Sequence, residues 1–588
     1  MPRPRRRTMI LALLLLACAS PAGGVAAQST VRAGTAIPPE GVGAVASRRG
    51  MVVSVSDIAS DIGASVLARG GNAVDAAVAT AFALAVTHPS AGNIGGGGFM
   101  VVRMANGEAT TFDFREKAPL SATPTMMLDP DGSIAYARTD SGWLAPGVPG
   151  TVRGMELAHR KLGKLPWRDV VLPAAQLARR GFPLSRALAE ELNRELKTTF
   201  APFPASVATY GRAGGQPWRA GDRLRLPDLA RSLRAIADSG ADAFYTGWIA
   251  DSIAEQMRAH GGAITRRDLA EYQAVERAPL RGTYLGHEIV AMGPPSSGGV
   301  VLIETLNQLE ALTAERFART SSDWLHLRIE AARRAYLDRA RYLGDPDFGA
   351  VPVERLTSRA YADSLARSID PDRASSSVTL GGALVAPTEP TETTHYSVVD
   401  AAGNAVAVTY TLEGGYGSGV VVRGAGFLLN NEMGDFNKKP GYTSTRGDIG
   451  TPPNVIAPGK RMLSSMTPTI VARNGELLLV TGSPGGRTIP NTVIDVVLGV
   501  VAFRLPLRAA VDAPRVHHQW LPDEVRYEEG AIPADARAEL EGMGHVLRGT
   551  PTRSQGDAHS IWYDAKTRTS YGVNDRRSPD SKASAPTK

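Results

Sequence analysis

The sequence predicts a mixed α+β fold, because helical and strand patterns both recur along it. Residues 57–69 and 72–86 have the apolar spacing of helices, and Asn72 stands at the N-cap position of the second. Residues 321–343 predict a long amphipathic helix whose arginine and glutamate side chains form a solvated face. Alternating apolar patterns predict three strand pairs, at 97–104 with 109–114, 394–399 with 405–411, and 467–472 with 476–481.

The first 27 residues have the pattern of a secretory signal. Four arginines within residues 3–7 precede an apolar run at 10–17, and Val25-Ala26-Ala27 forms a small-residue cleavage site. We therefore expect an exported protein, periplasmic or secreted. A second interpretation stays open, because Leu15-Leu16-Ala17-Cys18 resembles a lipoprotein cleavage box, which would place a lipid anchor on Cys18.

Composition, charge and cysteine content exclude several kinds of function. The chain has 588 residues with 43% hydrophobic content, enough for a large core. Its formal charge of +7 falls to +3 once the four leader arginines are removed, and the mature region has no Lys/Arg block, so we expect no nucleic-acid partner. Cys18 is the only cysteine, so a mature chain cut at residue 27 has no disulfide and no thiolate metal site.

The most informative segment is Thr393-Thr394-His395-Tyr396-Ser397-Val398-Val399-Asp400. A threonine hydroxyl can act as a nucleophile with its own α-amine as the base, provided the chain is cut just before it. The same residues also have the alternation of an ordinary half-buried strand. The segment alone therefore does not decide between a catalytic and a purely structural threonine.

Five further motifs accompany this segment in a fixed order and spacing. They are Asn93-Ile94-Gly95-Gly96-Gly97-Gly98-Phe99 with Asp113-Phe114-Arg115-Glu116-Lys117-Ala118-Pro119, Leu428-Leu429-Asn430-Asn431-Glu432-Met433-Gly434-Asp435-Phe436, Lys460-Arg461-Met462-Leu463-Ser464-Ser465-Met466-Thr467-Pro468-Thr469, and Thr481-Gly482-Ser483-Pro484-Gly485-Gly486-Arg487. Together they resemble the γ-glutamyltransferase family of N-terminal-nucleophile hydrolases, from about Val42 to about Val573.

The resemblance implies a four-layer αββα sandwich built jointly by two chains of one precursor. Self-cleavage between Glu392 and Thr393 would give a large chain, 28–392, and a small catalytic chain, 393–588, which form a heterodimer. It implies no cofactor and no metal. Residues 574–588 are polar and rich in proline and serine, which predicts a disordered tail.

The catalytic roles follow from the register and from the resemblance. If 394–399 and 405–411 form a hairpin that pairs residue 399 with 405, Thr393 lies opposite Thr411. The resemblance assigns Thr411 the role of orienting the nucleophile, and the N–H groups of Gly485 and Gly486 that of an oxyanion hole. The free α-amine of Thr393, with a pKa of about 8, suits a base near neutral pH.

The implied substrates are glutathione and other γ-glutamyl compounds, with water, an amino acid or a peptide as the acceptor. The family's carboxylate-binding positions are Arg115, Ser464 and Ser465, and its ammonium-binding positions are Glu413, Glu432 and Asp435. Two features depart from the family pattern. Glu413 stands where many relatives have Asn, and the lid-like segment 437–459 has Arg446 at its tip, where an aromatic side chain would cover the substrate, with Tyr442 the nearest replacement.

Two other functions are compatible with this scaffold. A related acylase would accept glutaryl groups of cephalosporins, but a glutaryl group has no ammonium and would leave the three carboxylates unpaired. A periplasmic binding protein that has lost processing would keep the pocket only. The presence of Thr393, Thr411 and the pair Gly485-Gly486 favours an enzyme.

Overall fold

The computed structural model describes residues 43–382, 393–445, 448–551 and 555–587. The predicted leader with Cys18, the residue Glu392 and the lid tip Arg446 lie outside these residues. Within the described part, no helix combines the length and the apolar character needed to cross a bilayer.

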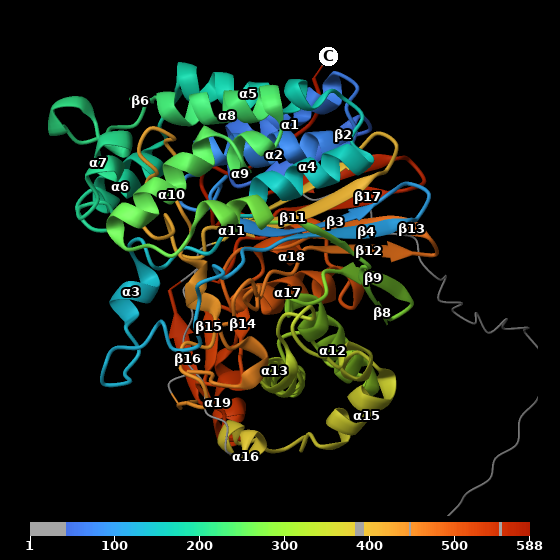
Figure 1. The fold of residues 1–588 in the computed structure, drawn as a ribbon. Helices are drawn as coiled ribbons and strands as arrows, with labels where there is room; N and C mark the ends of the chain where they lie inside the picture. Colours follow the sequence, from blue (N-terminus) through green and yellow to red (C-terminus); the bar gives the residue numbers. More distant parts are fainter. Residues whose placement is uncertain (1–42, 383–392, 446–447, 552–554, 588) are drawn as a thin grey trace, which may run out of the picture. The chain divides into compact units, whose positions relative to one another are not determined.

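Two antiparallel seven-stranded sheets form the centre of the fold (Figure 1). The first sheet has the order β19 (Lys582–Ser584), β2 (Gly50–Ser54), β10 (Thr394–Asp400), β11 (Ala405–Thr411), β3 (Gly97–Arg103), β4 (Ala109–Phe114) and β7 (Val275–Arg277). The second has the order β1 (Val45–Ser47), β18 (Thr569–Val573), β17 (Ser560–Asp564), β13 (Glu476–Thr481), β12 (Thr469–Arg473), β9 (His287–Ala291) and β8 (Leu280–Tyr284). Two small sheets add β14 (Val516–His517), β15 (Val525–Glu528) and β16 (Leu547–Thr550), and β5 (Phe182–Pro183) with β6 (Arg223–Leu224).

Side-chain alternation along the first sheet separates two cores. Val52, Val398 and Val408 point to one side, where they pack with helices, whereas Met51 and Val399 point to the other side, toward the second sheet. Successive strand residues face opposite sides of a sheet, so strands that are apolar at every position predict burial on both faces. The first sheet is therefore an inner layer, as an αββα sandwich requires.

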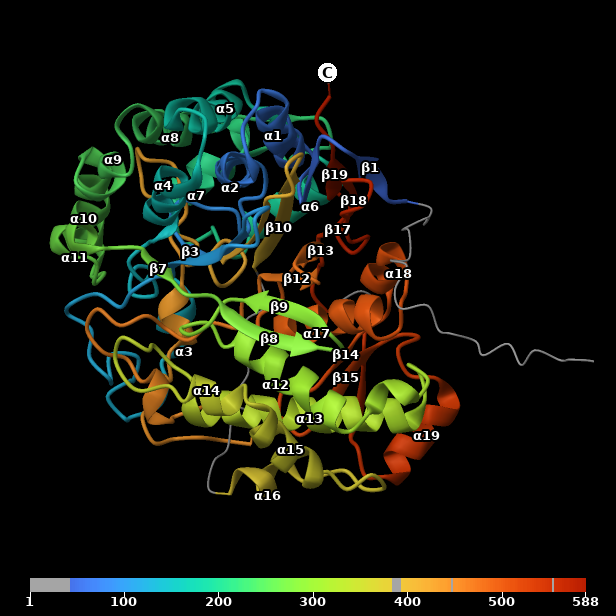
Figure 2. The same ribbon diagram turned by 90° about the vertical axis from the view of Figure 1, so that its right-hand side faces the viewer.

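Helices cover the outer faces of both sheets (Figure 2). Those packed with the first sheet or with each other on that side are α1 (Asp57–Ala68), α2 (Ala73–Thr87), α4 (Thr151–Leu162), α5 (Trp167–Arg180), α6 (Arg186–Glu195), α7 (Pro204–Tyr210), α8 (Pro227–Ser239), α9 (Asp242–Tyr245), α10 (Trp248–His260) and α11 (Arg266–Glu271). On the side of the second sheet lie α12 (Gly298–Ala311), α13 (Ser322–Tyr342), α14 (Val353–Leu356), α15 (Arg359–Arg367), α16 (Ser377–Gly381), α17 (Thr488–Val501), α18 (Leu507–Asp512) and α19 (Ala534–Gly542). The short α3 (Tyr136–Asp140) lies in the loop that follows β4. The four layers confirm the predicted αββα architecture.

The predicted elements form with small changes at their ends. Asn72 caps α2 through its side chain, and Asp75 completes a capping box. The three predicted strand pairs are β3 with β4, β10 with β11, and β12 with β13. The pattern of helix and strand periodicity was therefore sufficient to locate the elements around the site.

The predicted solvated face of the long helix is wrong. In α13 the side chains of Arg328, Glu330, Arg333 and Arg334 are all 3% exposed or less. The charges are buried because they neutralise one another: Glu330 accepts hydrogen bonds from Arg333 Nε at 3.0 Å and from Arg334 at 2.6 Å. An amphipathic charge pattern cannot distinguish such an internal network from a face in water.

The predicted disordered tail is also wrong for residues 574–587. β19 lies in this segment and pairs with β2 at the edge of the first sheet. Ala583 and Ser584 are buried, and Asp575 is 0% exposed. A polar composition indicates disorder only when the segment has no strand to pair with and no charged partner. This segment has both, because β19 pairs with β2 and Asp575 pairs with Arg515.

Each sheet contains strands from both sides of residue 393. In the first sheet β10 and β11 lie between β2 and β3, and β2 lies between β19 and β10. In the second sheet β12 pairs with both β13 and β9. The two predicted chains therefore share both sheets.

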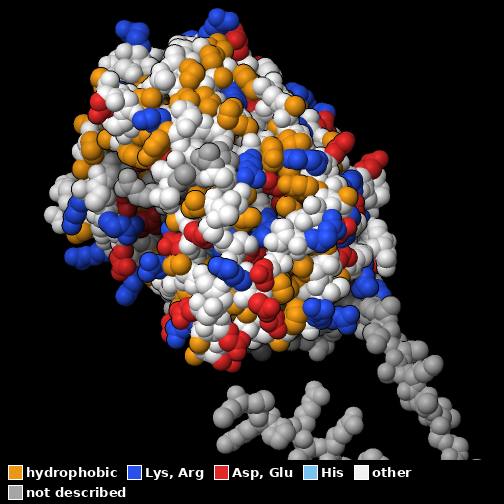
Figure 3. Space-filling model, turned by 90° about the horizontal axis from the view of Figure 1, so that it is seen from below, with side chains coloured by type: hydrophobic (Ala, Val, Ile, Leu, Met, Phe, Trp, Pro, Cys, Tyr) orange, Lys and Arg blue, Asp and Glu red, His pale blue; other side chains and the backbone are white. Residues whose placement is uncertain are grey.

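Basic and acidic side chains are interspersed on the face shown in Figure 3, with apolar side chains scattered among them. Mixed charge of this kind is typical of a soluble surface.

Candidate functional site

Thr393, the residue immediately before β10, lies next to the end of β11 in the continued hairpin register. The ladder pairs Val399 with Ala405 and Thr394 with Tyr410. This is the predicted register, and one further step sets Thr393 opposite Thr411. Both are buried, with exposures of 7% and 2%.

Thr411 is held by a turn and by the glycine-rich segment before β3. Its Oγ1 accepts a hydrogen bond from the Glu413 N–H at 2.8 Å, and its carbonyl accepts one from Asn93 Nδ2 at 2.8 Å. A Cβ on Gly96 would lie 2.0 Å from the Thr411 carbonyl oxygen, so only glycine allows this approach. Asn93 also accepts from the Gly96 N–H at 2.9 Å, which fixes the segment.

The predicted oxyanion loop lies between β13 and α17. Gly485 and Gly486 have φ values of 123° and 53°, in the left-handed region that favours glycine. Their carbonyl oxygens accept from the N–H groups of Thr488 and Ile489 in the first turn of α17. Gly482, at the start of the loop, lies against His395 of β10, since a Cβ there would be 2.3 Å from the imidazole Cε1. The loop therefore begins in space beside His395, the residue two positions after Thr393 in the chain.

Arg115 is the cation at the centre of an acidic cluster. It is 0% exposed, so it is not a surface partner of Glu116. Its guanidinium forms ion pairs with Glu432 and Asp435, and lies 3.6 Å from a carboxylate oxygen of Glu116. Glu413 joins them: a Cβ on Gly434, between Glu432 and Asp435, would lie 3.7 Å from Glu413 Oε1.

The cluster contains more carboxylates than cations, and its pKa values reflect this. Burial raises the pKa of Glu432 well above its ordinary value, and although Arg115 opposes this shift, Glu116, Asp435 and Glu413 add to it. Burial likewise raises the pKa of Glu116 to about 7, against the effect of Arg115. Burial alone would lower the pKa of Arg115, but the carboxylates outweigh it and raise that pKa. An entering ammonium group would relieve this excess of negative charge.

The two predicted serines adjoin Arg115 through the backbone. Arg115 donates to the carbonyls of Met462 and Leu463 at 3.3 and 3.4 Å. The next residue, Ser464, accepts at its Oγ from the Met466 N–H at 3.2 Å, and Ser465 Oγ accepts from Arg339 at 3.0 Å. The site therefore brings together the predicted carboxylate-binding and ammonium-binding residues.

The described part of the lid-like segment folds back on itself beside Asp435. The Gly441 N–H donates to the Gly450 carbonyl at 2.8 Å. Together with Tyr136, the segment lines a hollow that also includes Asp435 and Arg487. The Tyr136 hydroxyl donates to Asp448 at 2.9 Å, so α3 tethers the segment. Tyr442 is 40% exposed, and Arg446 lies outside the described residues.

Sequence reasoning missed Tyr136, Arg339 and Glu116 as members of the site. Tyr136 begins the short helix α3, which carries no motif, and Arg339 is one of several arginines in α13. Glu116 gave a signal, because it adjoins Arg115 in a motif that the resemblance places in the substrate pocket. Both side chains of the pair are 0% exposed, so it is not a contact on the surface.

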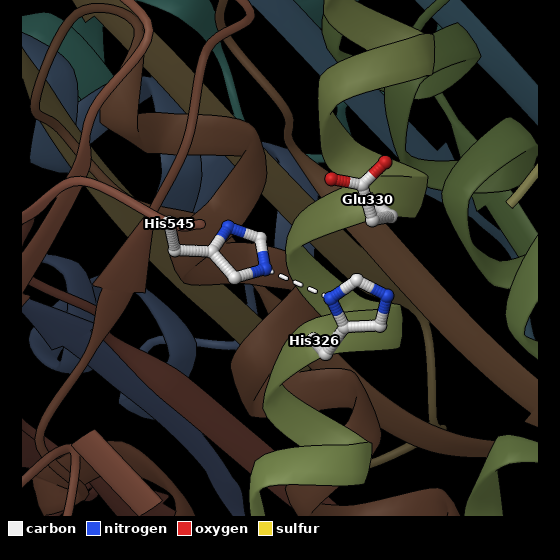
Figure 4. Close-up of side chains that lie close together, drawn as sticks. All are labelled: His326, Glu330 and His545. Atoms are coloured by element: carbon white, nitrogen blue, oxygen red, sulfur yellow. Dashed lines mark hydrogen bonds between the residues drawn. The ribbon is translucent and has the colours of Figure 1, made fainter. Parts of the chain in front are cut away.

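A second cluster of titratable side chains lies away from this site (Figure 4), where His326, Glu330 and His545 offer ligand atoms within 4.8 Å of one another. His326 Nε2 donates to the Asp370 carbonyl at 2.8 Å, so in the neutral pair its Nδ1 accepts from His545 Nε2, also at 2.8 Å. A cation would have to displace that proton and compete with the two arginines on Glu330. We therefore interpret the cluster as structural.

Comparisons with known proteins all find gamma-glutamyltranspeptidases and related acylases. A family model described as Gamma-glutamyltranspeptidase matches residues 59–585. The Glutathione hydrolase proenzyme of Escherichia coli is 45% identical over 98% of both chains, and the Acylase ACY 1 proenzyme of a Pseudomonas species is 37% identical over 88% of this chain and 90% of its own. Among solved structures, the cephalosporin acylase from Bacillus halodurans has a TM-score of 0.79 at 28% identity, covering 92% of this chain and 96% of that one. The Helicobacter pylori gamma-Glutamyltranspeptidase has a TM-score of 0.53 at 44% identity, covering 54% of this chain and 91% of that one.

Proposed function

The chain belongs to the gamma-glutamyltranspeptidase family, and from this premise we propose that it is an exported, self-processing γ-glutamyltransferase and glutathione hydrolase with Thr393 as its nucleophile. The observation that carries the proposal is the buried Thr393 immediately before β10, which the hairpin register, continued by one step, sets opposite Thr411. A strand with only a structural role does not require this threonine pair beside a glycine loop.

Maturation uses the Thr393 hydroxyl at a stage when the Thr393 nitrogen is still part of the peptide bond to residue 392. Thr393 Oγ attacks the carbonyl of Glu392, the acyl group moves from nitrogen to oxygen, and water releases it. The freed α-amine then accepts the hydroxyl proton when Thr393 attacks a γ-glutamyl amide. The N–H groups of Gly485 and Gly486 stabilise the oxyanion of the tetrahedral intermediate. The amine of the donor leaves, and water or an amino-acid or peptide amine takes the acyl group.

The acidic cluster selects the donor. A γ-glutamyl group has an α-carboxylate and an α-ammonium at the end remote from the reacting amide. Arg115 with Ser464 and Ser465 receives the carboxylate, and Glu413, Glu432 and Asp435 receive the ammonium. A glutaryl group would leave those carboxylates without a cation, so the site favours γ-glutamyl over the acylase substrates.

The intact masses of the purified mature protein test the nucleophile. Wild type should give two chains, the smaller beginning at Thr393, and Thr393→Ala should give one uncut chain. Thr394→Ala is the matched control, because it removes a neighbouring buried threonine hydroxyl but should still be cut before residue 393. A single uncut wild-type chain would overturn the proposed maturation and favour the binding-protein alternative. Release of an aniline from a γ-glutamyl anilide by the cut enzyme tests the donor.

A further inference from the structure

The proposed oxyanion loop rests on a second segment, Gln555–Ala558. The Asp557 N–H donates to Ser483 Oγ at 2.8 Å, and this hydroxyl donates in turn to the Pro484 carbonyl at 2.7 Å. Ser483 is 0% exposed. One buried hydroxyl thus joins the supporting segment to the loop and also constrains the loop internally.

The two segments also meet backbone to backbone. A Cβ on Gly485 would lie 3.2 Å from the Cα of Gly556, and a Cβ on Gly556 would lie 2.4 Å from Ser483 Oγ. Gly556 has a φ of 65°, which favours glycine. Because neither position has room for a side chain, a displacement of the supporting segment would move the loop.

A buried ion network fixes the supporting segment. It consists of two cations and two carboxylates, each side chain 4% exposed or less: Arg515, Glu528, Asp575 and Arg577. Arg515 pairs with Asp575 at 2.5 Å, Arg577 pairs with Asp575 at 3.1 Å, and Arg577 also pairs with Glu528.

The network holds both ends of the segment through its backbone. The Gln555 N–H donates to Glu528 at 3.0 Å, and the Gln555 carbonyl accepts from Arg515. The Ala558 N–H donates to Asp575 at 2.8 Å. The segment is therefore clamped on each side of Gly556 and Asp557, the two residues that touch the loop.

We infer that Ser483 is a positioning residue for the oxyanion hole, held in place by the segment and its ion network. The inference rests on the proposed function. An oxyanion hole stabilises charge only if its donors already point to where the charge develops. The Ser483 hydroxyl lies under the loop, bonded to two backbone groups, so it acts through the direction of the Gly485 and Gly486 N–H groups and not by touching the substrate.

The test compares Ser483→Ala with Ser206→Ala in the processed enzyme. Ser206 is a close match, because its buried Oγ also donates to one carbonyl, of Gly419 at 2.7 Å, and accepts from one N–H, of Val421 at 3.0 Å. With rates expressed per cut active site, Ser483→Ala should lower kcat for a γ-glutamyl anilide about 10- to 100-fold and change KM less than about twofold. Ser206→Ala should leave both constants near wild type.

A boronic acid analogue of the γ-glutamyl group provides the second readout. A bond forms between Thr393 Oγ and boron, the hydroxyl proton passes to the α-amine, and the tetrahedral boronate mimics the oxyanion. Its inhibition constant should rise in Ser483→Ala by the same factor as kcat falls, whereas that of free glutamate should not change. A general loss of structure would weaken both inhibitors.

The outcomes separate this inference from the proposed function. A wild type without γ-glutamyl turnover overturns the proposed function, and the inference with it. An active wild type whose Ser483→Ala variant behaves like Ser206→Ala overturns the inference alone. If the alanine variant does not mature, Ser483→Cys replaces it, because its thiol fills the same space but accepts hydrogen bonds weakly, and the same separation of kcat from KM is expected.

Discussion

Arg115 and Asp435 form an ion pair in which the cation is fully buried and the carboxylate side chain is 13% exposed. A donor that approaches from solvent therefore meets Asp435 first. In the proposed function, the donor's α-carboxylate competes with Asp435 for the guanidinium, and its ammonium then pairs with the carboxylate it displaces. In the site without a donor, Arg115 and Asp435 pair with each other; in the proposed complex, each pairs with the oppositely charged group of the donor.

Asp435→Asn should weaken this exchange. The variant keeps the shape of the side chain but removes one negative charge from the ammonium side, so KM for a γ-glutamyl anilide should rise about 10-fold or more. The relative rate with a glutaryl anilide should increase, because that substrate brings no ammonium. Steady-state kinetics with both anilides measure the ratio. Asp251→Asn, on α10 outside the site and with a side chain 62% exposed, is the control; equal effects of both variants would contradict the assignment.

Glu116→Gln should change how stability depends on pH. Burial raises the pKa of Glu116 from 4.5 to about 7, so between these values the folded state binds more protons than the unfolded state. The stabilisation is complete below pH 4.5 and is lost as pH rises through 7. Glutamine stays neutral, so relative to wild type the variant should gain about 1 to 3 kcal/mol between pH 4 and pH 8.

Thermal unfolding of both proteins at several pH values measures this gain. The exposed Glu108 supplies the control variant Glu108→Gln, which should show no comparable trend. A difference between Glu116→Gln and wild type that is the same at pH 4 and pH 8 would refute the assignment.

Glu330→Gln should show the opposite dependence. Burial would raise the pKa of Glu330, but Arg333, the Ser375 N–H and Arg334 outweigh burial and lower it to about 2. The stabilisation is present above the unfolded pKa of 4.5 and is lost as pH falls through 2. At pH 7 the variant should lose about 3 to 5 kcal/mol, because buried Arg334 loses its carboxylate partner and Arg333 keeps only Asp523.

The stability difference between wild type and Glu330→Gln should become smaller as the pH falls from 4 to 2. Unfolding midpoints of both proteins, measured at pH 7 and at pH 3, test this. Glu541→Gln on the exposed side of α19 is the control. If the two variants are equally stable at pH 7, the network around Glu330 contributes nothing.

Periodicity predicted the elements near the site, and the register of one hairpin predicted that Thr393 lies opposite Thr411. The positions of these elements and the hairpin register are determined by residues close together in the chain, so the local sequence is enough to predict them. The buried charges of α13 and the order of the final residues also depend on partners far along the chain, such as Asp523, which lies 190 positions from Arg333. The support of Gly485 by Gly556 is a contact of two bare backbones, and no side-chain pattern records it.

Truncation at Val573 should abolish folding, in contrast to the expectation for a disordered tail. It removes Asp575 and Arg577 and leaves Arg515 and Glu528 buried without their ion partners, at a cost of about 3 to 5 kcal/mol for each broken pair. A chain ending at Ser581 loses only the short β19 and should remain folded with a lower melting temperature. Soluble yield and circular dichroism distinguish the two; a folded, active chain ending at Val573 would contradict the role of the network.

The presence of strands from both sides of residue 393 in each sheet has a consequence for the proposed two-chain form. Two subunits that meet at a docking surface separate on dilution, because their association follows mass action. Chains whose strands are hydrogen-bonded to one another in the same two sheets have no such surface, so separating them means unfolding both. The activity per cut molecule should therefore be the same at nanomolar and micromolar concentration, and the two chains mixed after separate synthesis should not combine into active enzyme.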